Sequence, residues 1–352
     1  MKFSQIMSIV LVVSLLVTSV PASADDHESY YTIGVQSGTT SDTYAADSLP
    51  NAVVMGYDTI DLAINALEQG DVNFVLGDLP TLKFYEADSD GLYIAGDFGA
   101  EDFGIGVATG ESDLLAAIDV ALTEIIDSGE YDSVFAGTFG DEIVVLTDDT
   151  TTDTATAYPA DPTGTLADAL AAGKLVFGSD TTYPPFESLD DNGNCVGFDC
   201  DMADAIAARI ATAYDQDFVA EMKTKTWDEL LAFTYDDYDA TLSAMTKTAQ
   251  RAENTDFSRA YYSSKQGILG SDDSPEINGV EDLDGLMIQY NLNEEDIALC
   301  TAYNEYEPEI EEETTTNETE ELVEKAVDEA PSLTLLVSVL AIGLIAIARR
   351  KH

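Results

Sequence analysis

Two oppositely charged side chains, Arg251 and Asp78, stand where they could hold the two ends of a small zwitterion. The guanidinium of an arginine is a planar, two-pronged donor that suits a carboxylate. Asp78 follows an apolar run at the end of a predicted strand, where α/β sheets place ligand-binding groups. Each residue also has a plainer interpretation. Arg251 could pair with a surface acid, which contributes little, and Asp78 could cap the helix that begins at Leu79.

Histidine and cysteine offer little chemistry in this sequence. The two histidines are His27 and His352, so a Ser-His-Asp triad, a Cys-His dyad or a histidine metal site would have no histidine in the interior of the chain. The three cysteines form neither a CxxC pair nor a disulfide framework. We expect Cys195 and Cys200 to be small core residues, because residues 196–199 have the pattern of a straight strand. A disulfide between them is the alternative. No metal or cofactor is expected.

The charge balance is strongly acidic. The 352 residues include 68 acidic and 14 basic side chains, for a formal net charge of −54. Nucleic acid and anionic lipid surfaces are poor partners for such a field, because both are polyanions. An acidic excess along the whole chain is beyond what solubility requires and suggests a saline external medium, where salt screens self-repulsion.

The elements that would position these residues alternate between strand and helix patterns. Strands are predicted at 31–36, 52–55 and 72–76, and helices at 41–49 and around Ile60, Ile64 and Leu67, which recur on one helical face. Such alternation indicates a parallel α/β sheet.

A second set of motifs runs from Lys174 to Ser264. An apolar strand ends at Asp180, and the set continues with Tyr183–Glu187 (Tyr-Pro-Pro-Phe-Glu), Val196–Asp199, Trp227–Leu231, Ser243–Thr246, Arg251 and Tyr261–Tyr262. In this order and spacing they resemble the first lobe of extracellular solute-binding proteins of family 3, the polar amino-acid-binding components of ABC importers. The resemblance implies a type II periplasmic-binding-protein fold, an α/β architecture of two lobes. Each lobe would be a mainly parallel sheet flanked by helices, and two hinge strands would join them.

The order of the lobes is unusual, because residues 30–140 resemble the second lobe and the closing segment of the family. The predicted organisation is 1–24 signal peptide, 30–103 lobe two, 104–140 closing part of lobe one, 141–165 Thr/Asp-rich linker, 166–270 opening part of lobe one, 271–290 return into lobe two, 291–330 acidic stalk and 331–352 C-terminal membrane anchor. This order suggests a circular permutant, which is tolerated where the original ends are close and exposed. Two broken copies that complete each other in a swapped dimer are the alternative.

The resemblance also implies roles for individual residues. Arg251, five residues after Thr246, stands where the family clamps the ligand carboxylate, and Asp78 stands where it holds the ammonium group. The remaining expected ligand-binding residues are Tyr183 and Trp227, which would sandwich the ligand, Gly38, Thr39 and Thr40 at a helix start, Thr246 and Ala244 in the clamp loop, and Asp180 as a selectivity residue. Ala244 replaces the family's usual glycine.

Two further side chains near the expected site are assigned structural roles. Phe186 is expected in the core, and Asp199 as the N-cap of the following helix.

The two ends of the chain indicate export. Residues 1–24 combine Lys2, an apolar run and a small-residue cleavage site, which is typical of a secretory signal. Leu333 to Ala348 is an apolar run followed by basic residues, which predicts a C-terminal anchor with its basic end in the cytoplasm. A removable sorting tail is the alternative. Asn317 begins a glycosylation sequon in the stalk.

The predicted function is capture of a free polar amino acid by closure of the lobes, followed by delivery to an ABC permease. The hinge is expected near Gln266–Gly270 and Phe103–Val107. One alternative is an enzyme on the same fold, such as a dehydratase or a lytic transglycosylase-like lyase. The other is a degenerate surface or sensor protein that takes no part in transport.

Overall fold

The computed structural model describes residues 28–140, 146 and 155–288. The predicted signal peptide, stalk, sequon and C-terminal apolar run lie outside these residues, as does part of the linker. Within the described ranges, no helix combines the length and the apolar character needed to span a membrane.

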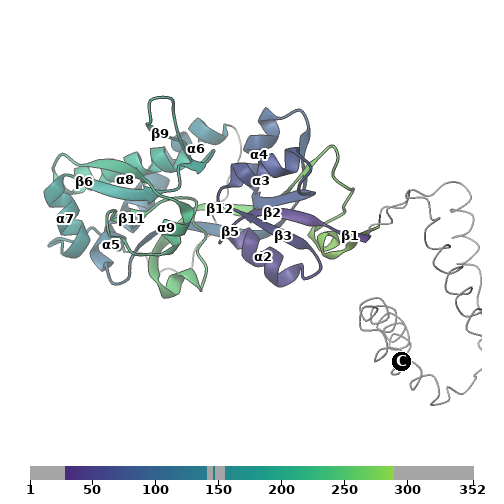
Figure 1. The fold of residues 1–352 in the computed structure, drawn as a ribbon. Helices are drawn as coiled ribbons and strands as arrows, with labels where there is room; N and C mark the ends of the chain where they lie inside the picture. The colour runs from purple at the N-terminus through teal and green to yellow at the C-terminus, as the bar shows by residue number, and fades with distance from the viewer. Residues whose placement is uncertain (1–27, 141–145, 147–154, 289–352) are drawn as a thin grey trace, which may run out of the picture. The chain divides into compact units, whose positions relative to one another are not determined.

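One eight-stranded sheet runs through the described part of the molecule (Figure 1). Its strands, in spatial order, are β10 (Val219–Thr224), β6 (Lys174–Ser179), β11 (Ala240–Thr241), β5 (Leu92–Ala108), β12 (Thr255–Ser271), β4 (Phe74–Asp78), β2 (Thr32–Gln36) and β3 (Val53–Tyr57). The three strands at each end are parallel to one another, whereas β5 and β12 are antiparallel to their neighbours. We call the β10–β6–β11 end lobe one and the β4–β2–β3 end lobe two. The predicted two-lobed α/β fold is confirmed.

Lobe two carries the helices α2 (Thr40–Ser48), α3 (Ile60–Glu68) and α4 (Leu79–Asp88). The helical face that the sequence predicts is buried, because Ile60, Ile64 and Leu67 are each at most 3% exposed. They face a strand of the same lobe, β4, whose five residues are all buried. A strand buried on both faces is the expected partner of helices in a parallel sheet.

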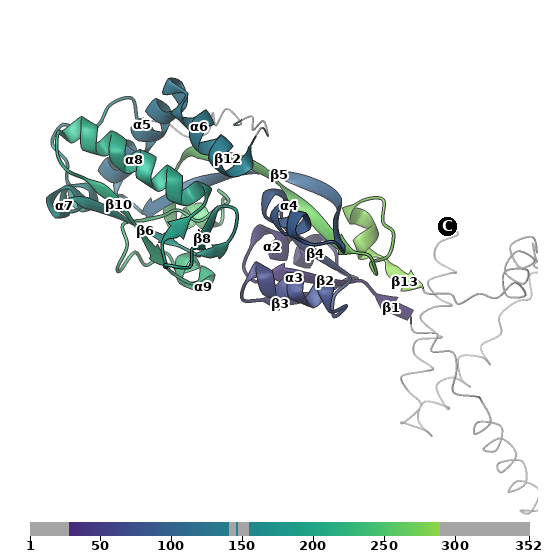
Figure 2. The same ribbon diagram turned by 90° about the horizontal axis from the view of Figure 1, so that it is seen from above.

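Lobe one carries α5 (Ser112–Ser128), α6 (Glu130–Phe139), α7 (Gly164–Ala172), α8 (Phe198–Tyr214) and α9 (Trp227–Leu231). Figure 2 shows α8 and α9 on opposite sides of β6. Phe186 is fully buried in an aromatic cluster, with ring centres 5.0 Å from Tyr262 and 5.4 Å from Phe103. Its predicted place in the core is confirmed.

The two long strands β5 and β12 connect the lobes. Phe103 pairs with Tyr262 on the lobe-one side, whereas Gln266 pairs with both Asp78 and Phe98 on the lobe-two side. The chain therefore passes between lobes at residues 99–102 and 263–265. The hinge ranges expected from the sequence lie next to this passage, inside the lobes, because a continuous strand gives no local signal of where it leaves one sheet.

The last described residues return to lobe two. β13 (Leu286–Ile288) pairs with β1 (Glu28–Tyr30), and the 3₁₀ helix η2 (Val280–Asp284) precedes it. Val280 and Leu283 are buried against Ile33 and Phe74 in one apolar cluster. This segment therefore completes the core that the first strands of the chain begin.

The expectation of two unbonded core cysteines is wrong, because Cys195 and Cys200 form a disulfide. A straight strand would separate their Cα atoms by about 16 Å, but the distance is 5.8 Å. The chain turns at Gly197, whose φ of +123° is accessible to glycine and whose added Cβ would lie 2.4 Å from the Phe186 carbonyl oxygen. This turn separates β9 (Cys195–Val196) from α8 and brings the two thiols together.

Asp199 is not the N-cap of α8, as the sequence suggested. Gly197 occupies that position, and Asp199 lies in the first turn of the helix, fully buried. Its carboxylate accepts hydrogen bonds from the backbone N–H of Ala244 and from the hydroxyl of Tyr261, both at 2.8 Å. The side chain therefore supports the loop that carries Ala244.

Candidate functional site

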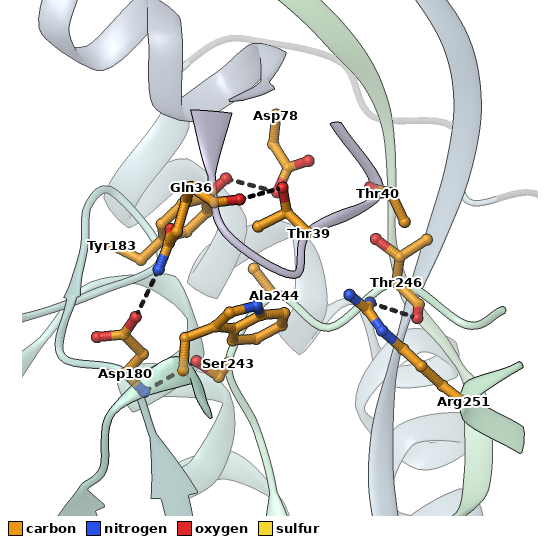
Figure 3. Close-up of a pocket in the computed structure, with 11 residues that line it drawn as sticks. Gln36, Thr39, Thr40, Asp78, Asp180, Tyr183, Ser243, Ala244, Thr246 and Arg251 are labelled. Carbon is orange, nitrogen blue, oxygen red and sulfur yellow. Dashed lines mark hydrogen bonds between the residues drawn. The ribbon is translucent and has the colours of Figure 1, made fainter. Parts of the chain in front are cut away.

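A small cavity lies between the lobes at the carboxyl ends of the parallel strands (Figure 3). β2 ends at Gln36, β4 ends at Asp78, and Asp180 directly follows β6. Polar groups at such strand ends are the usual ligand-binding groups of α/β sheets. The cavity is lined by Gln36, Thr39, Thr40, Asp78, Asp180, Tyr183, Trp227, Ser243, Ala244, Thr246 and Arg251.

This set contains every site residue expected from the sequence except Gly38, which lies at the edge of the cavity. The carbonyl oxygen of Gly38 accepts a hydrogen bond from Arg251 Nη2 at 3.3 Å. The cavity itself is small, because the centre of a water-sized sphere can move through about 20 Å³ of it. That is room for one or two water molecules. A free amino acid needs more space, so the lobes must part before it can enter.

Arg251 is a buried cation at the cavity wall. It begins the 3₁₀ helix η1 (Arg251–Glu253), is 8% exposed, and donates from Nη1 to the carbonyl oxygen of Thr246 at 2.9 Å. Its guanidinium carbon lies 5.2 Å from the ring centre of Trp227, a cation–π arrangement. Burial lowers the pKa of Arg251, while Asp78 and Glu101 oppose that shift. Among the described residues, no carboxylate lies within ion-pair distance of it.

Asp78 occupies the N-cap position of α4, but its side chain makes no capping bond. It turns into the cavity and accepts hydrogen bonds from the Tyr183 hydroxyl at 2.8 Å and from Gln266 Nε2 at 2.7 Å. Burial raises the pKa of Asp78 well above its usual value, and the neighbouring Glu101 raises it further. A buried carboxyl of this kind favours its neutral form unless a cation approaches.

Asp180 lies on the wall of lobe one opposite Gln36. Its Oδ2 accepts from Gln36 Nε2 at 3.0 Å, its Oδ1 accepts from Thr182 Oγ1 at 2.7 Å, and its backbone N–H donates to Ser243 Oγ at 2.9 Å. Burial raises the pKa of Asp180, and the bonds from Thr182 and Gln36 lower it. A donor group of a ligand could therefore replace the Gln36 amide as the hydrogen-bond partner of Asp180.

The turn from Gly38 to Thr40 begins α2. Gly38 has a φ of +74°, and the Thr39 hydroxyl caps the helix by accepting from Asp42 N at 3.2 Å. The Thr40 hydroxyl donates to Glu101 Oε2 at 3.1 Å. Thr39 and Thr40 therefore present backbone and hydroxyl groups at the cavity edge.

The loop from Ser243 to Thr246 forms part of the lobe-one wall. Ala244 has a φ of +42°, a conformation that favours glycine, so the alanine is held where the sequence resemblance expects a glycine. Its N–H is fixed by the buried Asp199 beneath it. The Thr246 hydroxyl donates to Glu101 Oε2 at 2.7 Å. The loop is therefore a strained turn that the Asp199 side chain holds in place.

Three hydrogen bonds bridge the lobes around the cavity and describe a closed form. They join Tyr183 to Asp78, Gln36 to Asp180, and Arg251 to Gly38. In each pair, one partner comes from each lobe. Every group that a zwitterion would use is therefore partnered across the gap, and a ligand must replace these bonds with its own.

Sequence reasoning missed four polar residues of the site. Gln36 and Ser243 line the cavity, while Gln266 and Glu101 lie directly behind Asp78. The position of Gln36 at the last residue of a predicted strand was a usable signal. Glu101, one of 68 acidic residues, had none. No group of three or more potential metal ligands is gathered within the residues that the structure describes.

The lobe-one part of this site falls in a recognisable sequence segment. Residues 175–327 match the profile of bacterial extracellular solute-binding proteins, family 3. This segment is similar to that family. The resemblance inferred from the motifs between Lys174 and Ser264 is confirmed, and Asp180, Tyr183, Trp227 and Arg251 all lie in the family 3 segment.

Curated proteins are similar to part of the chain. The chain is 32% identical over 107 residues to the ABC transporter arginine-binding protein 1 of Escherichia coli (strain K12), covering 30% of this chain and 42% of that protein. It is 35% identical over 111 residues to the probable histidine-binding protein of Neisseria gonorrhoeae, covering 29% and 39%. The chain therefore spans less than half the length of these relatives.

A solved structure is similar to part of the chain. The arginine-bound form of a mutant of domain 1 from TmArgBP is 29% identical, and the match covers 30% of this chain and 83% of that chain, with a TM-score of 0.25.

Proposed function

We propose that this protein is an extracellular binding protein that captures a polar amino acid between its lobes and delivers it to an ABC importer. The observation that carries the proposal is the buried guanidinium of Arg251, which has no carboxylate partner among the described residues. A buried charge without a counter-ion is costly. The carboxylate of a bound amino acid would supply the missing partner with two parallel hydrogen bonds.

The opposite end of the ligand would be held by Asp78. Its carboxyl is buried at the end of β4 and faces the same cavity from lobe two. The ammonium group would displace the Tyr183 hydroxyl that now donates to it. Because Arg251 lies on lobe one and Asp78 on lobe two, a ligand that carries both charges stabilises the closed form over the open one.

The side chain of the ligand would meet a polar group and two aromatic rings. Asp180 could accept from a cationic or hydroxyl-bearing side chain once Gln36 moves away. Tyr183 and Trp227 line the cavity, and the buried indole N–H of Trp227 has no partner within the described residues. Relatives named for arginine and histidine binding fit this polar, acidic pocket.

We further propose that the chain is a circular permutant of a family 3 protein that closes within one polypeptide. In support, residues 28–98 and 266–288 contribute to lobe two, and the segment between the two passages builds lobe one. Light scattering of the secreted protein in high salt is expected to give the mass of a monomer. A stable dimer would favour exchange of lobes between two chains. The C-terminal tether stays a prediction from the sequence.

The proposed function is tested by titrating the protein with each of the twenty standard amino acids in high salt, followed by calorimetry. At least one is expected to bind with a Kd of about 1 μM or tighter. The same ligand with its carboxylate amidated or its amine acetylated is expected to bind far more weakly, because each change removes one charged end. No binding by any amino acid would refute the proposal. Conversion of an amino acid into a new product in the calorimeter cell would favour an enzyme.

A further inference from the structure

We propose that Glu101 is a second acid of the ammonium end of the site, and that one proton held between Asp78 and Glu101 is released when a ligand ammonium group binds there. This inference rests on the proposed function, because it needs an amino-acid ligand. Glu101 lies on β5 at the passage between lobes, outside both the family 3 segment and the residues expected from the sequence.

The two carboxyl groups meet at one side-chain amide, that of Gln266. Asp78 Oδ1 and Glu101 Oε1 both accept from the same amide nitrogen, Gln266 Nε2, and the charge of Glu101 adds to burial in raising the pKa of Asp78. The bond from this nitrogen to Asp78 Oδ1 is 2.7 Å. Two ionised carboxylates this close would repel each other strongly in a buried site, so one must carry a proton.

The charged groups around the pair do not remove this requirement. Arg251 from η1 is the buried cation that influences Asp78, but its guanidinium donates to the backbone carbonyl oxygens of Thr246 and Gly38. Tyr183 from β7 (Thr182–Tyr183) donates as a neutral hydroxyl. Near Glu101, Lys247 lines a second cavity that adjoins the first. Lys265 bonds to Asp97 at 2.5 Å.

The proton belongs on Asp78 in the ligand-free closed form. Asp78 is the more deeply buried of the two, and burial is the main cause of its raised pKa, followed by the charge of Glu101. Glu101 Oε2 accepts hydrogen bonds from the hydroxyls of Thr40 and Thr246 at 3.1 and 2.7 Å. These threonines come from opposite lobes, so the carboxylate of Glu101 also ties the lobes together.

Ligand binding would then exchange one positive charge for another. The ammonium group enters with its three protons, the Asp78 carboxyl loses its proton, and both carboxylates become stabilised by the ammonium charge. The released proton has a route to solvent, because Glu101, Thr40, Thr246 and Gln266 also line an adjoining cavity of about 430 Å³. Binding therefore becomes tighter as pH rises, by up to about tenfold per pH unit, until Asp78 is already ionised in the free protein.

The experiment measures proton release with the amino acid that binds most tightly among the twenty. Calorimetry in buffers of different ionisation enthalpy, from about pH 5 to pH 8, is expected to report close to one proton released per ligand at the lower pH values. Glu101→Gln is expected to reduce the release and to move its disappearance to lower pH, because one cause of the raised pKa of Asp78 is gone. Asp78→Asn is expected to abolish it.

A control is Glu221→Gln, which changes an exposed acid of β10 and is expected to leave the proton release unchanged. Binding whose heat does not depend on the buffer, together with an affinity that is flat across this pH range, would overturn the inference while leaving the proposed function intact. Unchanged release in Glu101→Gln would also overturn it. If no amino acid binds, both the inference and the proposed function fail.

Discussion

Arg251→Ala is expected to weaken amino-acid binding by about 2–5 kcal/mol, or roughly thirty-fold to a few thousand-fold. The guanidinium is 8% exposed and is held in place by two backbone carbonyls and the Trp227 ring. Alanine would leave the ligand carboxylate in a desolvated cavity with no cation, and that penalty adds to the lost hydrogen bonds. Calorimetric titration with the ligand of the wild-type protein measures the change.

Two companion variants separate the charge of Arg251 from its geometry and from general effects. Arg251→Lys keeps a positive charge but loses the two-pronged donor, so its affinity is expected between those of the wild type and the alanine variant. Arg209→Ala removes an arginine of α8 that pairs with Glu130 far along lobe one, and it should bind normally. An affinity unchanged by Arg251→Ala in a folded protein would mean that the ligand lies elsewhere.

The sequence predicts the positions of the site residues well where they are tied to local patterns. Asp78 and Asp180 come at the ends of apolar strands, and Arg251 stands at a fixed offset from Thr246. Predictions from strand ends and short spacings agree with the structure because these features depend on nearby residues alone. The amphipathic face of α3 is predicted for the same reason, since helical periodicity needs no knowledge of the rest of the fold.

What the sequence does not predict depends on residues that meet only after folding. Glu101 and Gln266 are ordinary polar residues on two strands, and they become part of the site because β5 and β12 pair beside Asp78. The Cys195–Cys200 disulfide depends on a turn at Gly197, whereas the pattern of the surrounding residues predicts a strand there. In a chain with 68 acids, composition cannot separate buried carboxylates from exposed ones.

Glu187 and Asp199 are both fully buried in lobe one, and Asp199 gives the second large effect, in stability. Asp199→Ala is expected to lower the free energy of unfolding by about 2–4 kcal/mol, because the buried Ala244 N–H and Tyr261 hydroxyl would lose their acceptor. Urea unfolding in high salt measures the loss. Glu221→Ala, which changes an exposed acid of β10, is the control and should cost much less. Equal losses in the two variants would mean that the buried carboxylate does not support the loop.

The same pair should make stability depend on pH in a defined direction. Burial raises the pKa of Asp199 to about 6, and burial together with the charge of Asp199 raises the pKa of Glu187 well above its usual value. The folded protein therefore binds more protons than the unfolded chain. This contribution to stability is complete below about pH 4 and is lost as pH rises through the folded pKa values.

Glu187→Gln keeps an acceptor for the Ser243 hydroxyl, now at 2.6 Å, and removes one buried ionisable group. Its free energy of unfolding should fall less than that of the wild type between about pH 5 and pH 8. A fall as steep as in the wild type would show that other groups control the pH dependence.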